Sequence, residues 1–217
     1  MVCPLVTVLA YTGGVTDTEL ADASPSTEPR ENLRGLGIFL IVSGGIALAS
    51  ALILTIEKIH LLENPGEALN CDISAFVSCG GVVNQPQASA FGFPNTLLGI
   101  VGFTLVVMVG VLLASGVRLP RWYWGGVIVG VTFGIGFVTW LQSQSIYVIQ
   151  VLCPYCMVVW TMMIPIFVVA IGQAVRELRP ESGVGRFLVE WRVLIIALWY
   201  VVVASLIWFQ FGTTLWA

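Results

Sequence analysis

The sequence predicts an all-α protein that crosses a membrane several times. Of its 217 residues, 58% are hydrophobic and only 10% are charged, a composition far more apolar than that of a water-soluble domain. A helix needs about 20 apolar residues to cross roughly 30 Å of hydrocarbon. Five stretches reach this length, so we expect five transmembrane helices in one membrane domain, residues 35–212. They are residues 36–56, 96–117, 122–141, 154–174 and 193–211.

The basic residues predict the orientation of these helices. Eight of the nine lie before the first span or in the second and fourth connections between spans, and only Lys58 lies on the other face. Cytoplasmic loops of membrane proteins carry an excess of Lys and Arg. We therefore expect a multi-pass protein of the cell (plasma) membrane with its N-terminus in the cytoplasm and its C-terminus outside.

Residues 1–34 are expected to form a disordered cytoplasmic tail. A short apolar start is followed by Ser, Thr, Pro and acidic residues, without the basic start and sustained apolar core of a signal peptide. Cys3 is the one cysteine on this side, and we read it as incidental.

Charge excludes two classes of function. The net charge is only −3 and no basic patch occurs, which argues against a nucleic-acid partner. The five spans contain no charged residue, which argues against a transporter coupled to protons or ions.

Two cysteines lie in the first connection between spans, residues 57–95, which contains the stretch CDISAFVSCGG. We expect Asp72 to begin a helix of about a turn and a half that ends at Ser78, because Asp is a favoured N-cap residue. Cys71 and Cys79 would then flank a short mobile element on the extracytoplasmic face, where disulfides form and persist.

The other pair belongs to the stretch CPYC, at the start of the fourth span and on the same face. Pro154 suits the first turn of a helix, since its missing N–H would be unpaired there. Cys153 is then expected near the N-cap, with Cys156 one turn inside. The positive end of the helix dipole favours a thiolate, which is the nucleophile of disulfide exchange.

The cysteines allow other interpretations. Two cysteines can simply pack in a membrane helix, and four can hold zinc. However, the spacing of Cys71 and Cys79 is not that of a zinc knuckle, and His60 is remote, so no metal is expected. A soluble glutaredoxin is excluded because no βαβ pattern surrounds the motif.

Three motifs in this order, CDISAFVSC, FPNTLLG and CPYC, resemble the vitamin K epoxide reductase family, specifically its bacterial disulfide-forming branch without a fused thioredoxin domain. The resemblance covers residues 36–175. It implies a four-helix bundle around a quinone, to which bacterial members often add a fifth helix.

The resemblance also implies roles for individual residues. Cys71 and Cys79 match the loop shuttle pair, and Cys153 and Cys156 match the active-site pair. Asn95 matches an asparagine that hydrogen-bonds a quinone carbonyl.

Two positions depart from the family pattern. Trp160 occupies the place of a pocket tyrosine, and Gln85 stands where many relatives have serine. The alternative interpretations are that Asn95 caps a helix and that Trp160 belongs to the aromatic belt at the membrane surface.

The implied reaction carries two electrons from a secreted or membrane-anchored thiol oxidase of the thioredoxin fold to a membrane quinone of the menaquinone or ubiquinone type. The partner, expected to be a separate polypeptide, would attack the loop disulfide at Cys71. Freed Cys79 would attack Cys153, and Cys156 would be released beside the quinone.

Three alternatives to disulfide formation remain at this point. The first is a quinone or quinone-epoxide reductase whose main product is the reduced quinone. The others are an outward thiol reductant and a scaffold without catalysis.

Overall fold

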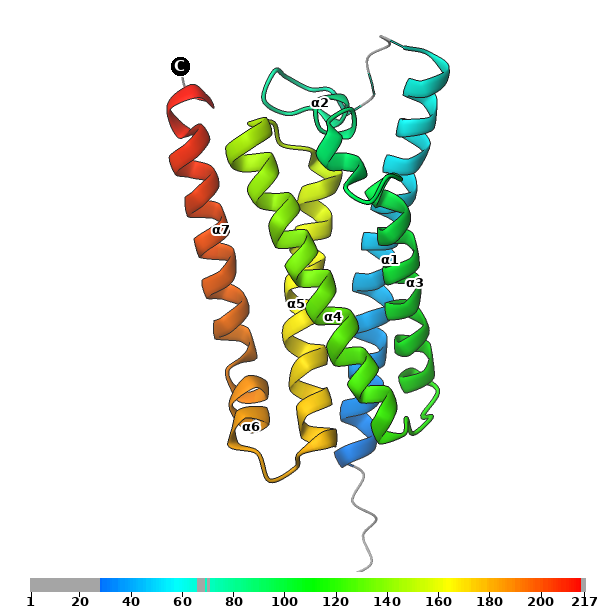
Figure 1. Ribbon diagram of the computed structural model, residues 1–217. Helices are drawn as coiled ribbons and strands as arrows, with labels where there is room; N and C mark the ends of the chain where they lie inside the picture. Colours follow the sequence, from blue (N-terminus) through cyan, green and yellow to red (C-terminus); the bar gives the residue numbers. More distant parts are fainter. Residues whose placement is uncertain (1–27, 66–68, 70, 216–217) are drawn as a thin grey trace, which may run out of the picture.

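A computed structural model describes residues 28–65, 69 and 71–215 of the chain. Five long helices run side by side as a bundle (Figure 1). Each is long and apolar enough to cross a membrane, which confirms the five predicted spans. They are α1 (Glu28–Glu63), α3 (Asn95–Ala114), α4 (Arg121–Ser143), α5 (Pro154–Leu178) and α7 (Arg192–Leu215).

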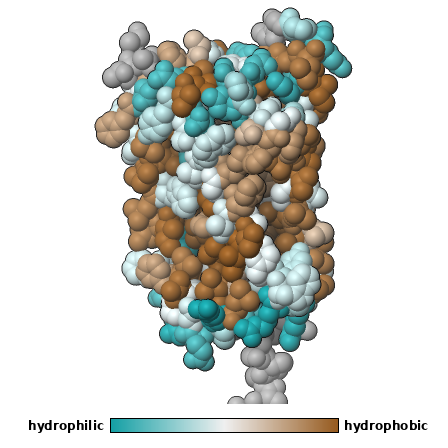
Figure 2. Space-filling view, in the orientation of Figure 1, coloured by the Kyte–Doolittle hydropathy of each residue, from teal (hydrophilic) through white to brown (hydrophobic). Residues whose placement is uncertain are grey.

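Shorter helices lie at the two ends of the bundle. At the end called here the cysteine end are α2 (Cys79–Val83) and a 3₁₀ helix, η1 (Pro86–Ser89), whereas α6 (Gly183–Glu190) lies at the opposite, α6 end (Figure 1). A broad band of hydrophobic residues separates hydrophilic residues at the two ends (Figure 2). This distribution fits a bilayer around the middle of the bundle.

Small residues bring α1 and α3 into close contact. A Cβ atom added at Gly37 would lie 2.6 Å from the backbone oxygen of Gly110, and one added at Gly110 would lie 2.8 Å from the oxygen of Gly37. Membrane helices associate closely through such small residues because lipid provides little hydrophobic force between them. This contact was not predicted from the sequence.

A proline inside α5 helps to attach α7. Pro165 lacks the N–H that would bond the carbonyl of Thr161 four residues earlier. The hydroxyl of Tyr200, on α7, donates to this carbonyl at 2.6 Å. The fifth transmembrane helix therefore satisfies a backbone group that the fourth leaves unpaired.

Some predicted boundaries are wrong. The first helix begins at Glu28, so residues 28–34 belong to α1 and not to a tail; residues 1–27, including Cys3, lie outside the described residues. The third span continues beyond α4 as a π-helix, η2 (Gln144–Ile149), which ends at Gln150 in the left-handed region with φ 56°. The stretch between the predicted third and fourth spans is thus mostly helical.

Candidate active site

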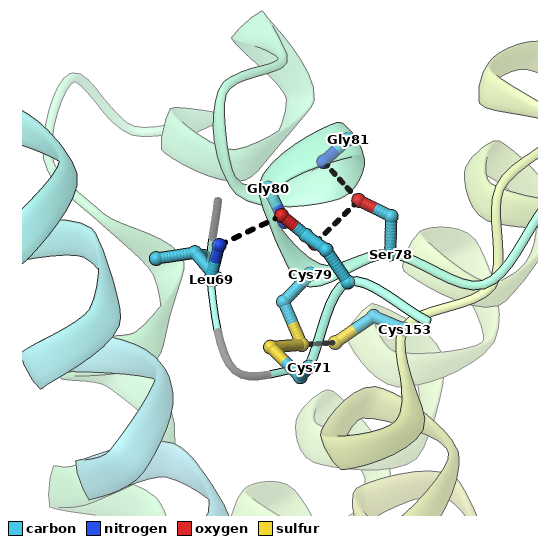
Figure 3. The surroundings of a disulfide bond; sticks show 8 residues. Leu69, Cys71, Ser78, Cys79, Gly80, Gly81 and Cys153 are labelled. Carbon is cyan, nitrogen blue, oxygen red and sulfur yellow. Dashed lines mark hydrogen bonds between the residues drawn. A yellow bond between two sulfur atoms is a disulfide. The ribbon is translucent and has the colours of Figure 1, made fainter. Parts of the chain in front are cut away.

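A disulfide between Cys71 and Cys79 lies at the cysteine end of the bundle (Figure 3). Their Cα atoms are 5.6 Å apart, and both residues are buried. The helix predicted from Asp72 to Ser78 is not formed. That stretch makes a tight turn between Ser74 and Val77, and the helix begins only at Cys79, with Ser78 as its N-cap.

The reason for this difference is the Asp72 carboxylate, which binds groups across the loop and does not cap a helix of its own. One carboxylate oxygen accepts from the Ser78 hydroxyl at 2.6 Å and from the Gly80 N–H at 3.0 Å. The other accepts from the Leu69 N–H at 3.0 Å. Burial raises the pKa of Asp72, but these bonds and one from the Cys79 backbone outweigh it and lower that pKa below its usual value.

The loop is docked on the segment that precedes α5. The Leu152 N–H donates to the Phe76 carbonyl at 2.8 Å, and the Ser78 N–H donates to the Leu152 carbonyl at 3.0 Å. Val77 and Leu152 thereby form a parallel β-bridge. Cys153 follows Leu152 directly and Cys79 lies two residues after Val77, so the bridge brings the two cysteines close together.

Cys153 lies next to the disulfide. Its Sγ is 3.6 Å from Cys79 Sγ, and the three sulfurs of Cys71, Cys79 and Cys153 lie in a row in Figure 3. Cys153 and Cys156 are free thiols. This arrangement suits exchange, in which a thiolate attacks one sulfur of a disulfide and the other sulfur leaves.

The start of α5 favours the thiolate form of Cys153. As predicted, Cys153 is the N-cap and Pro154 the first helical residue. A hydrogen bond from the Cys156 side chain lowers the pKa of the Cys153 thiol against the opposing effect of burial, with further help from the backbone N–H groups of Cys156 and Tyr155.

A cavity of about 140 Å³ lies beneath the cysteines, inside the bundle. Its walls come from α1, α3, α4 and α5, with α2 and η1 at the cysteine end and η2 beside α4. The lining is mainly apolar and includes Leu54, Phe103 and Phe137. Cys156 reaches this cavity, so the thiol pair joins it to the loop disulfide.

The sequence model of the vitamin K epoxide reductase family matches residues 38–171, more than half of the chain. The chain belongs to the vitamin K epoxide reductase family. The match includes both cysteine pairs and most of the first four long helices, whereas α6 and α7 lie outside it. No curated protein matches the chain in a sequence comparison. The protein is thus a multi-pass membrane protein of an oxidoreductase family.

The residues that this family resemblance indicated for the cavity are brought together there. Asn95, Trp160 and Cys156 all line it. Trp160 is only 5% exposed and packs with Ile146 and Leu152, which contradicts its interpretation as a surface belt residue.

Asn95 is not an N-cap, since that position belongs to Pro94. Its amide instead holds the loop before α3: Nδ2 donates to the Gln87 carbonyl at 2.6 Å, and Oδ1 accepts from the Ala90 N–H at 3.1 Å. One N–H of Nδ2 remains for another partner. Asn95 therefore shapes the cavity wall as well as lining it.

Two residues of the site were not predicted. Gln87 lines the cavity, and its Oε1 is buried without a hydrogen-bond partner in the described part of the chain. Lys58 Nζ donates to the Val83 carbonyl at 3.0 Å and so ties the end of α2 to α1. Neither residue lies in a recognisable motif. Gln85, where the family pattern has serine, bonds the Gly81 carbonyl and is not among the residues that line the cavity.

Proposed function

We propose that this protein is a membrane thiol:quinone oxidoreductase that supports disulfide formation outside the cytoplasm. It would reoxidise a secreted or membrane-anchored partner of the thioredoxin fold. The observation that carries the proposal is the continuous path from the Cys71–Cys79 disulfide, through Cys153, to Cys156 at the cavity.

The path supports a sequence of two-electron exchanges. A partner dithiol attacks Cys71 and leaves as a disulfide, so that Cys71 and Cys79 become thiols. Cys79 then attacks a Cys153–Cys156 disulfide at Cys153, and Cys156 leaves as a thiolate. Attack of Cys71 on Cys79 restores the loop disulfide and releases Cys153. In the structure the loop pair is oxidised and the CPYC pair is reduced. This is the state expected after the transfer.

The cavity is suited to the ring of a quinone of the menaquinone or ubiquinone type. Its lining is mainly apolar, and the second N–H of the Asn95 amide offers a hydrogen bond to a ring oxygen. When bound, a quinone would take two electrons and two protons from the Cys153 and Cys156 thiols, which would form their disulfide again, and it would leave as a hydroquinone. The buried Gln87 oxygen is an acceptor suited to a hydroquinone hydroxyl.

The charge distribution supports an extracytoplasmic position for the cysteine end. The eight arginines lie near the α6 end, in the first turns of α1, around the connection from α3 to α4, and from the last turn of α5 to the start of α7. The positive-inside rule assigns this end to the cytoplasm. A partner that acts on secreted proteins would meet the loop disulfide on the opposite side. With this orientation, we propose the plasma membrane as the location of the protein.

Thiol trapping tests this proposal. The purified protein is reduced, freed of reductant, and alkylated with or without a soluble quinone. We expect quinone to convert all four cysteines of the two pairs to disulfides, with Cys153→Ala protein remaining reduced in its loop pair. Quinone-dependent oxidation of the loop pair in Cys153→Ala protein, as fast as in the unaltered chain, would contradict the relay. Measuring hydroquinone release with and without a reduced thioredoxin-fold protein distinguishes a disulfide-forming enzyme from a quinone reductase.

A further inference from the structure

A second hollow lies at the α6 end, far from the cysteines. It is a groove of about 520 Å³ between α1, α5, α6 and α7. The family match ends within α5, so α6 and α7 add walls to this groove that the matched region does not contain. The groove plays no part in the proposed thiol relay.

The groove is polar at one end and apolar along the rest. Arg176, in the last turn of α5, and Arg192, the first residue of α7, line its polar end. Neither guanidinium makes a hydrogen bond or an ion pair within the described residues. Of the neighbouring acids on these elements, Glu177 accepts a bond from Gln173 at 2.9 Å, and Glu190 ends α6. Two positive charges are therefore left without a partner among the residues that the structure describes.

The apolar part of the groove runs along α5 toward the middle of the bundle. Pro165 lies 11 residues before Arg176 on the same helix, a distance of about 16 Å at 1.5 Å per residue. Half of a typical hydrocarbon core is about 15 Å thick. Val169, Val193 and Ile196 line the groove between these levels. Its length thus matches one leaflet.

From this arrangement we infer that the groove binds one anionic phospholipid of the leaflet at the α6 end. The phosphate lies between Arg176 and Arg192, because guanidinium groups form paired hydrogen bonds with phosphate oxygens. One acyl chain lies along α5 between Val169 and Ile196. Basic pockets between transmembrane helices are a recognised setting for acidic lipid headgroups.

The lipid would also hold α7 to the bundle. None of the apolar window of α7 is buried in protein, and the groove separates part of this helix from α5. A lipid in the groove contacts both helices and supplements the Tyr200 hydrogen bond.

Native mass spectrometry of the full chain in detergent tests this inference. Phosphatidylglycerol and phosphatidylcholine with the same acyl chains are added in turn, and the fraction of protein that retains one lipid is measured. We expect at least tenfold tighter retention of phosphatidylglycerol. Equal retention of the two lipids by the unaltered protein would overturn the inference, as would displacement of phosphatidylglycerol by millimolar inorganic phosphate alone, which would indicate a site for the free ion.

A matched pair of variants locates the site. The double variant Arg176→Gln/Arg192→Gln should lose the preference for phosphatidylglycerol. The control Arg118→Gln/Arg186→Gln removes the same charge from exposed residues at the same end that do not line the groove, and it should keep the preference. If both variants lost the preference for phosphatidylglycerol equally, lipid would be attracted nonspecifically to a basic surface, and the proposed site would be wrong. Quinone-dependent thiol oxidation, measured in parallel, should be unchanged, so failure of the lipid site and failure of the proposed function are distinguishable.

Discussion

The Sγ atom of Cys153 lies 3.6 Å from the Sγ atom of Cys79, in the interior of the protein. Cys79 is joined to Cys71, so the loop disulfide presents its inner sulfur to the thiol at the start of α5. In the proposed relay, this relationship makes Cys79 and Cys153 the two cysteines of the internal exchange.

The first prediction concerns that exchange. In Cys156→Ala protein the Cys153 thiolate can attack Cys79, and no second thiol on α5 resolves the product. A Cys79–Cys153 disulfide should accumulate, with Cys71 free. Peptide mapping after acid quenching and alkylation measures it, and the Cys153→Ala variant is the control. Recovery of a Cys71–Cys153 disulfide instead would show that Cys71, and not Cys79, exchanges with Cys153.

The second prediction concerns the pH dependence of the loop. The pKa of Asp72 is lowered below its usual 3.8 in the folded protein, so its carboxylate stabilises the loop fully above pH 3.8, and this contribution is lost as the pH falls through the lower folded value. Reduction of the Cys71–Cys79 disulfide by a small phosphine should therefore accelerate only in strong acid.

The Asp72→Asn variant provides the comparison for this loop. An amide nitrogen cannot accept the bonds that Asp72 receives from Leu69 or Gly80. Its loop disulfide should be reduced faster than that of the unaltered protein at neutral pH, with little further acceleration in acid. A variant as resistant as the unaltered protein would show that the carboxylate does not hold the loop.

The third prediction concerns the separate contributions of the Asn95 and Gln87 side-chain amides to quinone binding. Removing a hydrogen bond to a ring oxygen costs roughly 1–3 kcal/mol, so Asn95→Ala should slow quinone reduction about tenfold or more while thiol exchange with a partner continues. Because Asn95 also holds η1, Gln87→Leu is the cleaner change: it keeps the backbone carbonyl that Asn95 bonds.

For Gln87→Leu we expect weaker hydroquinone binding and slower quinone reduction, measured by equilibrium titration and stopped-flow absorbance. Gln85→Leu, in the same loop but away from the cavity lining, controls for loop damage. Unaltered binding and rate in Gln87→Leu protein would exclude contact between Gln87 and the ligand.

The fourth prediction concerns α7. Tyr200→Phe leaves the Thr161 carbonyl, which Pro165 already deprives of a helical partner, without the bond from the Tyr200 hydroxyl. Such bonds between membrane helices average about 0.6 kcal/mol, so unfolding in detergent should shift by about that amount. Proteolysis in the connection between α5 and α7 should become faster. Tyr147→Phe, at an exposed side chain, serves as control. An equal shift in the unfolding of that variant would show that the Tyr200 hydrogen bond does not stabilise the protein specifically.

Much of the fold followed from local sequence properties. The number of spans depends on apolar length, and each of the five predicted spans corresponds to a long helix. The position of Cys153 at the start of α5 followed from Pro154, which suits the first helical turn. The loop was predicted wrongly because Asp72 was assigned to the helix it could begin, whereas its carboxylate bonds residues on both sides of the turn.

By itself the sequence determined the membrane-spanning lengths, the sided distribution of charge and the two cysteine pairs, since each depends on neighbouring residues or on simple composition. The family resemblance implied exchange between Cys79 and Cys153, but only the tertiary structure decided that Cys79, and not Cys71, lies beside Cys153, 74 residues along the chain. The same holds for the buried Gln87 amide at the cavity and for the Tyr200 bond to Thr161. The physical reason is that distances between remote side chains are set by how the helices pack and by which backbone groups remain to be paired, and neither quantity is local in sequence.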